Sequence, residues 1–324
     1  MTPDTDSPIA ICCAADDGYG VALATMVASV QAHLAPGRRI ALYVFDEGLT
    51  AGTRQRALDS WDPARVHVHW LTTATDRVAH LPLWGTMTAA TYDRLLLPER
   101  LPPALGKVLW LDCDVVVTAD IARLWDLDLA DRALLAVQDL VVPFVSSRHG
   151  VAAYRDLGLP PSMGYFNAGV MLVNLDVWRR QDLTARALDY LERHRDEVTF
   201  WDQEGLNAAA GGHWGELDPR WNHVAGLCGR AFFAAPHLDA AVYRQVVEDP
   251  WIVHFAGSFK PWRYHNANPS RALYFHYVDQ TAWAGWRPAP TWRSRLMGLY
   301  ERRLRDVFYP AEAWRIALLR RRGR

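Results

Sequence analysis

Short apolar runs alternate with amphipathic stretches along the first third of the chain. The apolar runs are rich in Ile, Val and Leu, which favours buried strands, whereas the stretches between them carry the three-to-four-residue spacing of helices. We predict strands at residues 9–15, 40–45, 66–71 and 107–112, and helices at about 20–34, 50–60 and 88–97. This alternation is typical of βαβ units and predicts an α/β fold with a mostly parallel, Rossmann-like sheet flanked by helices.

The alternation continues less regularly downstream. The sequence has strand-like runs at 133–139 and 165–175, a predicted helix over about 176–194, and further segments at 200–212 and 251–262. No repeat, low-complexity stretch or long linker interrupts them, so one domain is expected over residues 1–265. Residues 266–324, which are rich in Trp and Arg, are expected to form a helical C-terminal extension.

Composition is that of a folded protein with a large core. Half of the 324 residues are apolar, which is enough to bury one large α/β domain. No apolar stretch approaches the roughly 20 residues of a membrane span, and the N-terminus lacks the marks of a secretory leader, so we expect a cytoplasmic protein. The scattered cysteines are expected to be buried apolar residues rather than disulfides or zinc ligands. They are Cys12, Cys13, Cys113 and Cys228.

Charge is unevenly distributed along the chain. The formal net charge is −1, but residues 291–324 hold ten Arg against three acidic residues, a net +7 that leaves −8 elsewhere. Basic residues surround an apolar helical face in this tail, which favours an anionic membrane surface. The face comprises Trp292, Leu296, Leu299, Leu304 and Phe308. The alternative is a helical pair packed on the main domain, whereas nucleic acid is not expected as a partner because the body is acidic.

Two aspartates one residue apart, Asp112 and Asp114, end the apolar run at 107–112. Of three such pairs in this Asp-rich chain, only this one ends a buried strand. The two-residue period of a strand points both carboxylates the same way, and adjacent anions withdrawn from water need a metal ion or a basic partner. Solvated capping of the strand end is the alternative.

Two kinds of enzyme use this pattern. An aspartyl-phosphate phosphatase uses the first aspartate as a nucleophile, whereas a sugar-nucleotide transferase uses the pair to bind a divalent metal. The phosphatase needs a further acidic pair of the Gly-Asp-x-x-x-Asp type downstream, and none follows. The strand at 107–112 is also fourth in order rather than first. The sequence therefore favours the transferase.

Further motifs occur in order around this pair. They are AADDGY (14–19), TYDRLLLPERLP (91–102) continuing into KVLWLDCDVVVTADIARLWDLDL (107–129), YFNAGVMLVNLDVWRR (165–180), DQEGLN (202–207) and HFAGSFKPW (254–262). Over about residues 9–262 the chain resembles glycosyltransferase family 8, the group of bacterial lipooligosaccharide α-galactosyltransferases and glycogenin. The resemblance implies a GT-A fold, a UDP-galactose or UDP-glucose donor, and Mn²⁺ or Mg²⁺ as cofactor.

The resemblance also implies which residues hold the metal and the diphosphate. Asp112, Asp114 and His254 match the metal ligands, a carboxylate and imidazole set that suits Mn²⁺ or Mg²⁺. Lys260 matches a lysine that meets the diphosphate, and Gly257 would let the backbone approach the phosphates. The alternatives are a core histidine at His254 and a solvated surface lysine at Lys260.

The uridine and ribose end of the donor maps to the first motif. The resemblance implies that Asp16 contacts the base edge, that Tyr19 stacks on the ring, and that Arg94 reaches the donor. Gly18 stands where relatives often carry a ribose-binding asparagine, so that contact is not expected. A plain helix N-cap at Asp16 and a surface salt bridge at Arg94 are the alternatives.

The donor hexose maps to residues further along. The matching positions are Asp139, Asn167, Ala168, Gly169, Asp202 and Gln203. Asp139 and Asp202 are expected to bind sugar hydroxyls, because fixed polar partners reject the wrong epimer. Turn formation by Asn167 and helix capping by the Asp202–Glu204 segment are the alternatives. Gln203 occupies the place of a nucleophile but is an amide, so the resemblance implies retention by attack on the face that UDP leaves.

The residues thus predict a metal-dependent, retaining UDP-hexose transferase with a carbohydrate or lipid-linked acceptor, as in lipopolysaccharide biosynthesis. Residues 140–164 are expected to form a lid or an acceptor-side loop. Galactose and glucose both remain open as the transferred sugar. The alternative functions are a UDP-sugar-binding protein with little transfer activity and a peripheral membrane scaffold that uses only the tail.

Overall fold

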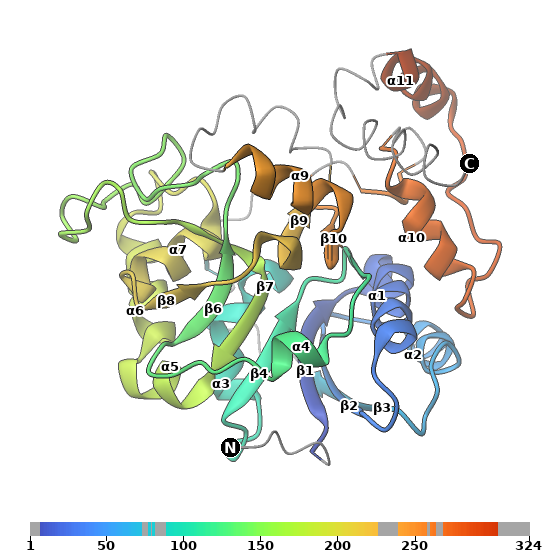
Figure 1. Cartoon of the computed structure of the whole chain (residues 1–324), viewed down its shortest axis with the longest axis horizontal. Helices are drawn as coiled ribbons and strands as arrows, with labels where there is room; N and C mark the ends of the chain where they lie inside the picture. Colours follow the sequence, from blue (N-terminus) through green and yellow to red (C-terminus); the bar gives the residue numbers. More distant parts are fainter. Residues whose placement is uncertain are drawn as a thin grey trace.

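The computed structural model describes residues 7–72, 77–78, 80–81, 89–225, 239–257, 260–263 and 268–303. A central sheet crosses the molecule, with helices on both of its faces and the C-terminal segments to one side (Figure 1). Within the described residues, no helix is long and apolar enough to span a bilayer.

Seven strands form the main sheet in the order β3-β2-β1-β4-β7-β6-β8. The strands are β1 (Ile9–Ala15), β2 (Ile40–Asp46), β3 (Val66–Thr72), β4 (Lys107–Leu111), β6 (Leu134–Gln138), β7 (Phe166–Asn174) and β8 (Trp214–Glu216). All of them run in the same direction except β7, which is antiparallel to both of its neighbours. The predicted α/β fold with a mostly parallel sheet is confirmed.

A second, smaller sheet carries one of the predicted metal ligands. It joins β5 (Val115–Val117), β10 (Ile252–His254) and β9 (His223–Val224), with β10 in the middle. Because β10 is antiparallel to β5, His254 pairs with Val115, the residue after Asp114. The backbone N–H of Phe255 donates to the carbonyl of Asp114 at 2.9 Å. This sheet thus brings the two distant parts of the chain together.

The helices broadly follow the predicted pattern. They are α1 (Gly20–His33), α2 (Ala51–Leu58), α3 (Leu97–Arg100), α4 (Ala122–Trp125), α5 (Leu175–Gln181), α6 (Leu183–Arg193), α7 (Trp201–Ala210), α9 (Ala240–Glu248), α10 (Arg271–Val278) and α11 (Trp292–Arg303), with the 3₁₀ helices η1 (Asp17–Tyr19), η3 (Ala89–Leu96) and η4 (Pro219–Asn222).

Two predicted helices differ from the structure. The helix expected at 88–97 is the 3₁₀ helix η3, and the short α3 begins next to Pro98, because proline is tolerated only in the first turn of an α-helix. The helix expected at 176–194 is two helices, broken at Asp182, whose φ of +50° is left-handed. Aspartate tolerates that conformation better than most residues.

Apolar residues fill both faces of the sheet. Along β1, Ile9, Ile11 and Cys13 face the core beneath α1, whereas Ala10 and Cys12 face the core beneath α5 to α7. Burial on both faces explains why β1, β2 and β4 are continuous apolar runs rather than alternating ones. Each fully buried Ile or Leu contributes about 1.5–3 kcal/mol to folding. Cys12, Cys13 and Cys113 are buried and free, as predicted, and Cys228 lies outside the described residues.

Residues beyond 265 also contact the main domain. Helix α10 lies beside α1 (Figure 1), where the Tyr277 hydroxyl is 2.7 Å from His33 Nε2 and Tyr274 is fully buried in the core. The Arg56 guanidinium stacks on the Trp283 ring at 4.5 Å. The division of the chain near residue 265 stays a prediction, but the first helix after it packs on the main domain.

Candidate active site

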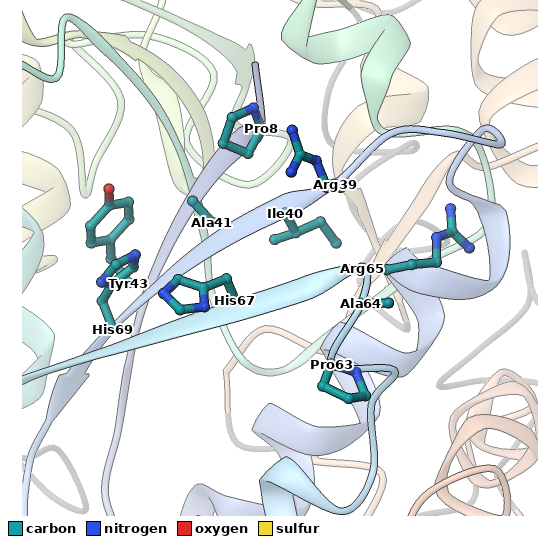
Figure 2. Close-up of a pocket in the computed structure, with 10 residues that line it drawn as sticks. All are labelled: Pro8, Arg39, Ile40, Ala41, Tyr43, Pro63, Ala64, Arg65, His67 and His69. Atoms are coloured by element: carbon teal, nitrogen blue, oxygen red, sulfur yellow. The ribbon is translucent and has the colours of Figure 1, made fainter. Parts of the chain in front are cut away.

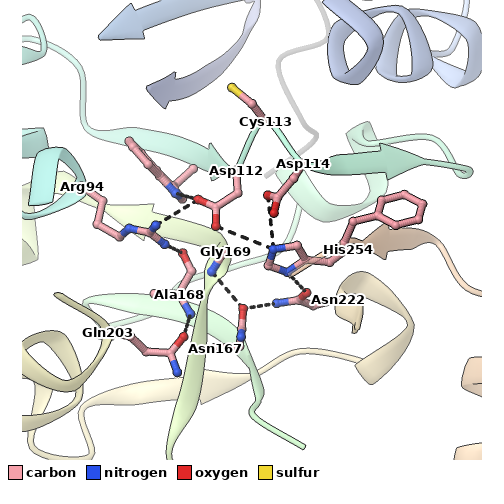
Figure 3. A network of polar contacts seen from close by, with 12 residues as sticks. Arg94, Asp112, Cys113, Asp114, Asn167, Ala168, Gly169, Gln203, Asn222 and His254 are labelled. Carbon is pink, nitrogen blue, oxygen red and sulfur yellow. Dashed lines mark hydrogen bonds and ion pairs between the residues drawn. The ribbon is translucent and has the colours of Figure 1, made fainter. Parts of the chain in front are cut away.

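The two aspartates lie in the turn between β4 and β5, not on a strand. Strand β4 ends at Leu111, one residue before Asp112, so the expectation that strand periodicity aligns the carboxylates is wrong. The turn aligns them instead. Asp112 Oδ2 and Asp114 Oδ1 lie 3.7 and 3.4 Å from His254 Nε2 (Figure 3). The Cys113 side chain turns away, with its Sγ 3.2 Å from the carbonyl of Ala14.

These three side chains fit a divalent cation. Each of Asp112, Asp114 and His254 offers a ligand atom, and the three atoms lie within 4.8 Å of one another. Asp114 and His254 are buried, so hydration does not stabilise the charge there. Two carboxylates and one imidazole are the ligand set that suits Mn²⁺ or Mg²⁺ with phosphate oxygens. In the part of the chain that the structure describes, no other group of three such residues is this close.

Lys260 lies beside the aspartates. Its ammonium contacts Asp114 Oδ2 and donates to the carbonyl of Phe255 at 3.2 Å. The Lys260 side chain is only 14% exposed, so the alternative of a solvated surface lysine is wrong. Burial alone would raise the pKa of Asp114, but the Lys260 ammonium opposes it, and the pKa lies below its ordinary value. The Asp114 side chain therefore stays ionised at neutral pH.

Arg94 connects the metal-site aspartate to the predicted sugar site. Its guanidinium pairs with Asp112 at 3.1 Å and Asp202 at 2.7 Å, and it donates to the carbonyl of Ala168 at 2.6 Å. The side chain is only 12% exposed, so the alternative of a surface salt bridge is wrong. Burial would lower the pKa of Arg94, but Asp112 and Asp202 raise it. For Asp202 burial dominates and raises the pKa to about 6 although Arg94 opposes it.

The predicted sugar-site residues converge where β6, β7 and α7 meet. Asp139 Oδ2 accepts from Asn167 Nδ2 at 2.9 Å and from Gln203 Nε2 at 3.2 Å. Gln203 Oε1 accepts from the backbone N–H of Ala168 at 3.0 Å. Both polar ends of the Gln203 amide are thereby held by the protein. Asp139, Asn167, Ala168 and Gln203 therefore form one network, which Figure 3 shows in part.

Gly169 is where the β7 backbone meets the metal-site side chains. A Cβ at this position would lie 2.3 Å from His254 Cε1 and 2.9 Å from Asp112 Oδ2, closer than real atoms approach. The backbone N–H of Gly169 donates to Asn167 Oδ1 at 3.0 Å. This bond spans only two residues, so Asn167 does have the turn-forming role that is the alternative to sugar binding. The same side chain also bonds Asp139. Only glycine therefore fits at position 169 without moving its neighbours.

Gly257, the other glycine predicted for the site, has a φ of +76°, which is the left-handed region that favours glycine.

At the predicted uridine end, Asp16 is a helix cap. Its Oδ1 accepts from the backbone N–H of Tyr19 at 3.0 Å, which confirms the capping alternative; contact with a base stays a prediction. Tyr19 is half-buried, meets the edge of Trp262 at 5.3 Å between ring centroids, and has a pKa raised by burial to about 12. The tyrosine therefore stays neutral and aromatic at any physiological pH.

The Asp202–Glu204 segment lies in the first turn of α7, whose N-cap is Phe200. Glu204 accepts from the backbone N–H of Thr199 at 2.8 Å and from the Tyr190 hydroxyl at 2.8 Å. Asp202 instead pairs with Arg94, and Gln203 bonds Ala168 and Asp139. The capping alternative is therefore wrong for this segment: Glu204 holds the chain that leads into α7, whereas Asp202 and Gln203 belong to the site.

Two residues of the site have no counterpart in the sequence-based set. Asn222 is buried, with its Oδ1 2.9 Å from His254 Nδ1, and Trp110 Nε1 donates to Asp112 Oδ1 at 2.8 Å. Asn222 ends η4 immediately before β9. A polar residue just before a strand is a weak signal in a sequence, and it points to the site only once β9 is known to lie beside β10.

A separate hollow of about 430 Å³ lies at the opposite end of the sheet (Figure 2). Pro8, Arg39 and Arg65, which line it, precede β1, β2 and β3, whereas the aspartates follow the end of β4. Its polar side chains are His67, His69, Tyr43 and the two arginines, with no carboxylate among its lining residues. The hollow is therefore not the metal and diphosphate site.

The fold and the aspartate, histidine and lysine cluster define a GT-A-type glycosyltransferase. Residues 10–266 match glycosyl transferase family 8, and the chain belongs to that family. General stress protein A of Bacillus subtilis (strain 168) is 30% identical over 272 residues, which cover 83% of this chain and 92% of that protein.

Other relatives include named hexosyltransferases. The lipopolysaccharide 1,3-galactosyltransferase of Salmonella typhimurium and the lipopolysaccharide 1,2-glucosyltransferase of Escherichia coli (strain K12) are each 25% identical over 272 residues, covering 82% of this chain and 75% of each relative. Among solved structures, the galactosyltransferase LgtC in complex with donor and acceptor sugar analogues superposes with a TM-score of 0.73 and 27% identity, over 89% of this chain and all of that chain.

Proposed function

We propose that this glycosyltransferase transfers galactose or glucose from a UDP-sugar to a glycan or lipid-linked acceptor, with retention of configuration and with Mn²⁺ or Mg²⁺ bound. The observation that carries the proposal is the convergence of Asp112, Asp114 and His254 next to Lys260 and Arg94. Such a group of anions, imidazole and cations suits a cation and a diphosphate held together. Kinship to a galactosyltransferase and a glucosyltransferase supports a hexose.

The diphosphate end is assigned from the geometry of the charged groups. Asp112, Asp114 and His254 Nε2 would hold the cation, which neutralises charge on the departing diphosphate. The Lys260 ammonium, already within reach of Asp114, would bind a phosphate oxygen. Gly257, at positive φ, offers backbone without a side chain near that lysine. Asp16 and Tyr19, which follow β1 at the same edge of the sheet, would hold uridine.

The sugar end is assigned to the network around Asp139. Asp139 and Asp202 would accept bonds from hexose hydroxyls, and Asn167 with the backbone of Ala168 and Gly169 would border the ring. Gln203 is fixed at both ends of its amide and is not a nucleophile. The acceptor hydroxyl would therefore attack the anomeric carbon on the face that UDP leaves. The carbon–oxygen bond to phosphate breaks as the new one forms, and the leaving phosphate takes the hydroxyl proton.

The acceptor is proposed to be part of a glycolipid at the inner face of the cell membrane, as in lipopolysaccharide biosynthesis. Helix α11 supports this, because Trp292, Leu296 and Leu299 are exposed by 72, 62 and 56% along one helical face. Arginines flank that face in a tail of net charge +7. The protein would then be cytoplasmic and peripherally bound, with residues 266–324 as its extension. Leu304 and Phe308 of the predicted face lie outside the described residues.

A second candidate function is a UDP-sugar-binding protein with little transfer. One experiment separates the two: purified protein is incubated with separate UDP-sugars, with Mn²⁺ or with a chelator, and released UDP is measured. We expect Mn²⁺-dependent release of UDP from UDP-galactose or UDP-glucose, because water substitutes slowly for a missing acceptor. Binding of these donors without any release, with or without cell-envelope glycolipid, would favour the binding protein.

A further inference from the structure

We propose that Asn222 is a positioning residue that fixes which nitrogen of His254 faces the cation site, and that it ties this site to the sugar-binding network. The inference rests on the proposed function, since it concerns the same cation. Asn222 is 2% exposed and sits between the two parts of the site in Figure 3. Within the described residues, both bonds of its side chain lead to residues of the site.

The bonds of Asn222 form one continuous chain. Its Oδ1 lies 2.9 Å from His254 Nδ1, and its Nδ2 donates to Asn167 Oδ1 at 2.8 Å. Asn167 Nδ2 in turn donates to Asp139 Oδ2 at 2.9 Å. Asp139 also holds Gln203. A single row of side-chain amides thus joins the imidazole of the cation site to the carboxylate of the sugar site.

The direction of every bond in this row is fixed by chemistry. The backbone N–H of Gly169 can only donate, so the Asn167 atom 3.0 Å away is the oxygen. The Asn222 atom facing that oxygen must then be its NH₂ group, which leaves the Asn222 oxygen for His254. An oxygen there requires a hydrogen on His254 Nδ1. In the neutral form of the ring, which is the form that binds a metal, the lone pair therefore lies on Nε2, the nitrogen that faces Asp112 and Asp114.

This assignment has a direct consequence for metal affinity. The other tautomer of His254 would present an N–H to the site and could not act as a ligand. Removing Asn222 frees the imidazole to rotate and to exchange tautomers, and loss of such a supporting bond typically weakens metal binding by about 10–100-fold. The same loss releases Asn167, which loosens the partner of Asp139.

The test measures Mn²⁺ binding directly, in the presence of UDP, by electron paramagnetic resonance of the free ion. We expect Asn222→Ala to bind Mn²⁺ at least about tenfold more weakly than the unaltered protein. We expect Asn222→Asp to retain Mn²⁺ affinity, because its carboxylate still accepts from His254 Nδ1. The aspartate cannot donate to Asn167 Oδ1. The KM of the Asn222→Asp variant for the UDP-sugar should therefore rise, while the affinity of this variant for Mn²⁺ in the presence of UDP should not fall.

Asn207→Ala is the matched control. Asn207 is equally buried and bonds only backbone, accepting from Phe166 N and donating to the carbonyls of Phe166 and Gln203. We expect it to lower the melting temperature and to leave Mn²⁺ affinity unchanged. Unaltered Mn²⁺ affinity in Asn222→Ala, or an equal loss in Asn207→Ala, would overturn the inference. Absence of Mn²⁺ binding by the unaltered protein would instead overturn the proposed function.

Discussion

Single side chains decide how closely the elements of this site can approach. Gly169 is the clearest case, because its missing side chain leaves the room that His254 and Asp112 occupy. Asp114 is another, since Lys260 keeps its carboxylate ionised in a buried place. Both effects combine to hold the carboxylate oxygens of the two aspartates and a ring nitrogen of His254 within 4.8 Å of each other. The site is thus shaped before any substrate arrives.

Replacing Gly169 with alanine should damage the cation site without unfolding the protein. The added methyl would lie 2.3 Å from His254 Cε1, so the imidazole must move. We expect Mn²⁺ affinity in the presence of UDP to fall by at least about tenfold. Gly52→Ala in α2 is the control, because nothing lies within 4 Å of its added Cβ. Equal Mn²⁺ affinity in the two variants would show that the close approach at Gly169 is unimportant.

A buried carboxyl outside the cation site should make stability depend on pH. Asp93 is fully buried, and burial together with the nearby Glu47 raises its pKa to about 8 despite an ion pair with Arg100 at 3.3 Å. Between about pH 4 and pH 8 the folded protein holds a proton that the unfolded chain releases, so stability falls as pH rises through this window.

Asp93→Asn should remove that dependence, since an amide does not titrate. Melting temperatures are measured for both proteins from pH 5 to pH 9. The difference between the variant and the unaltered protein should grow by several degrees in favour of the variant up to about pH 8, and should stay constant at higher pH. Asp189→Asn, at an exposed position, should show a constant difference. A flat difference for Asp93→Asn as well would mean that Asp93 ionises normally.

At the scale of elements, the long strands were predictable and the short ones were not. The apolar runs that became β1, β2 and β4 are buried on both faces, and such runs are visible in a sequence. The β5, β9 and β10 strands have two or three residues each, too few to show a period. Their pairing nevertheless places His254 beside Asp114. His254 was predicted as a metal ligand from the family resemblance, whereas its hydrogen-bond partner Asn222 depends on strand pairing and was missed.

Helix α11 supports the membrane proposal at the same scale. Deletion of residues 291–324 should abolish binding to vesicles that contain phosphatidylglycerol, because it removes the exposed Trp292, Leu296 and Leu299 and a net charge of +7. Cosedimentation measures the bound fraction, and UDP release in solution should stay unchanged. Neutral vesicles serve as the control. Binding of the truncated protein to anionic vesicles at the original level would contradict the role of the tail.

At the scale of the whole molecule, the sheet direction sets where chemistry can occur. Ligands in such sheets bind beyond the carboxyl ends of the parallel strands, and the polar residues after β1, β4 and β6 gather there with the start of β7. The predicted fold and most site residues followed from this rule and from the resemblance to family 8. The directions of the amide bonds and the choice of capping for Asp16 required coordinates, because they depend on which atoms face each other.

The central claim is that one divalent cation binds between Asp112, Asp114 and His254. Crystals grown with UDP and Mn²⁺, with anomalous diffraction recorded at the manganese edge, test it most directly. The predicted result is one strong anomalous peak in contact with both carboxylates, His254 Nε2 and the diphosphate of UDP. A peak elsewhere, or UDP bound with no peak at these three side chains, would contradict the claim.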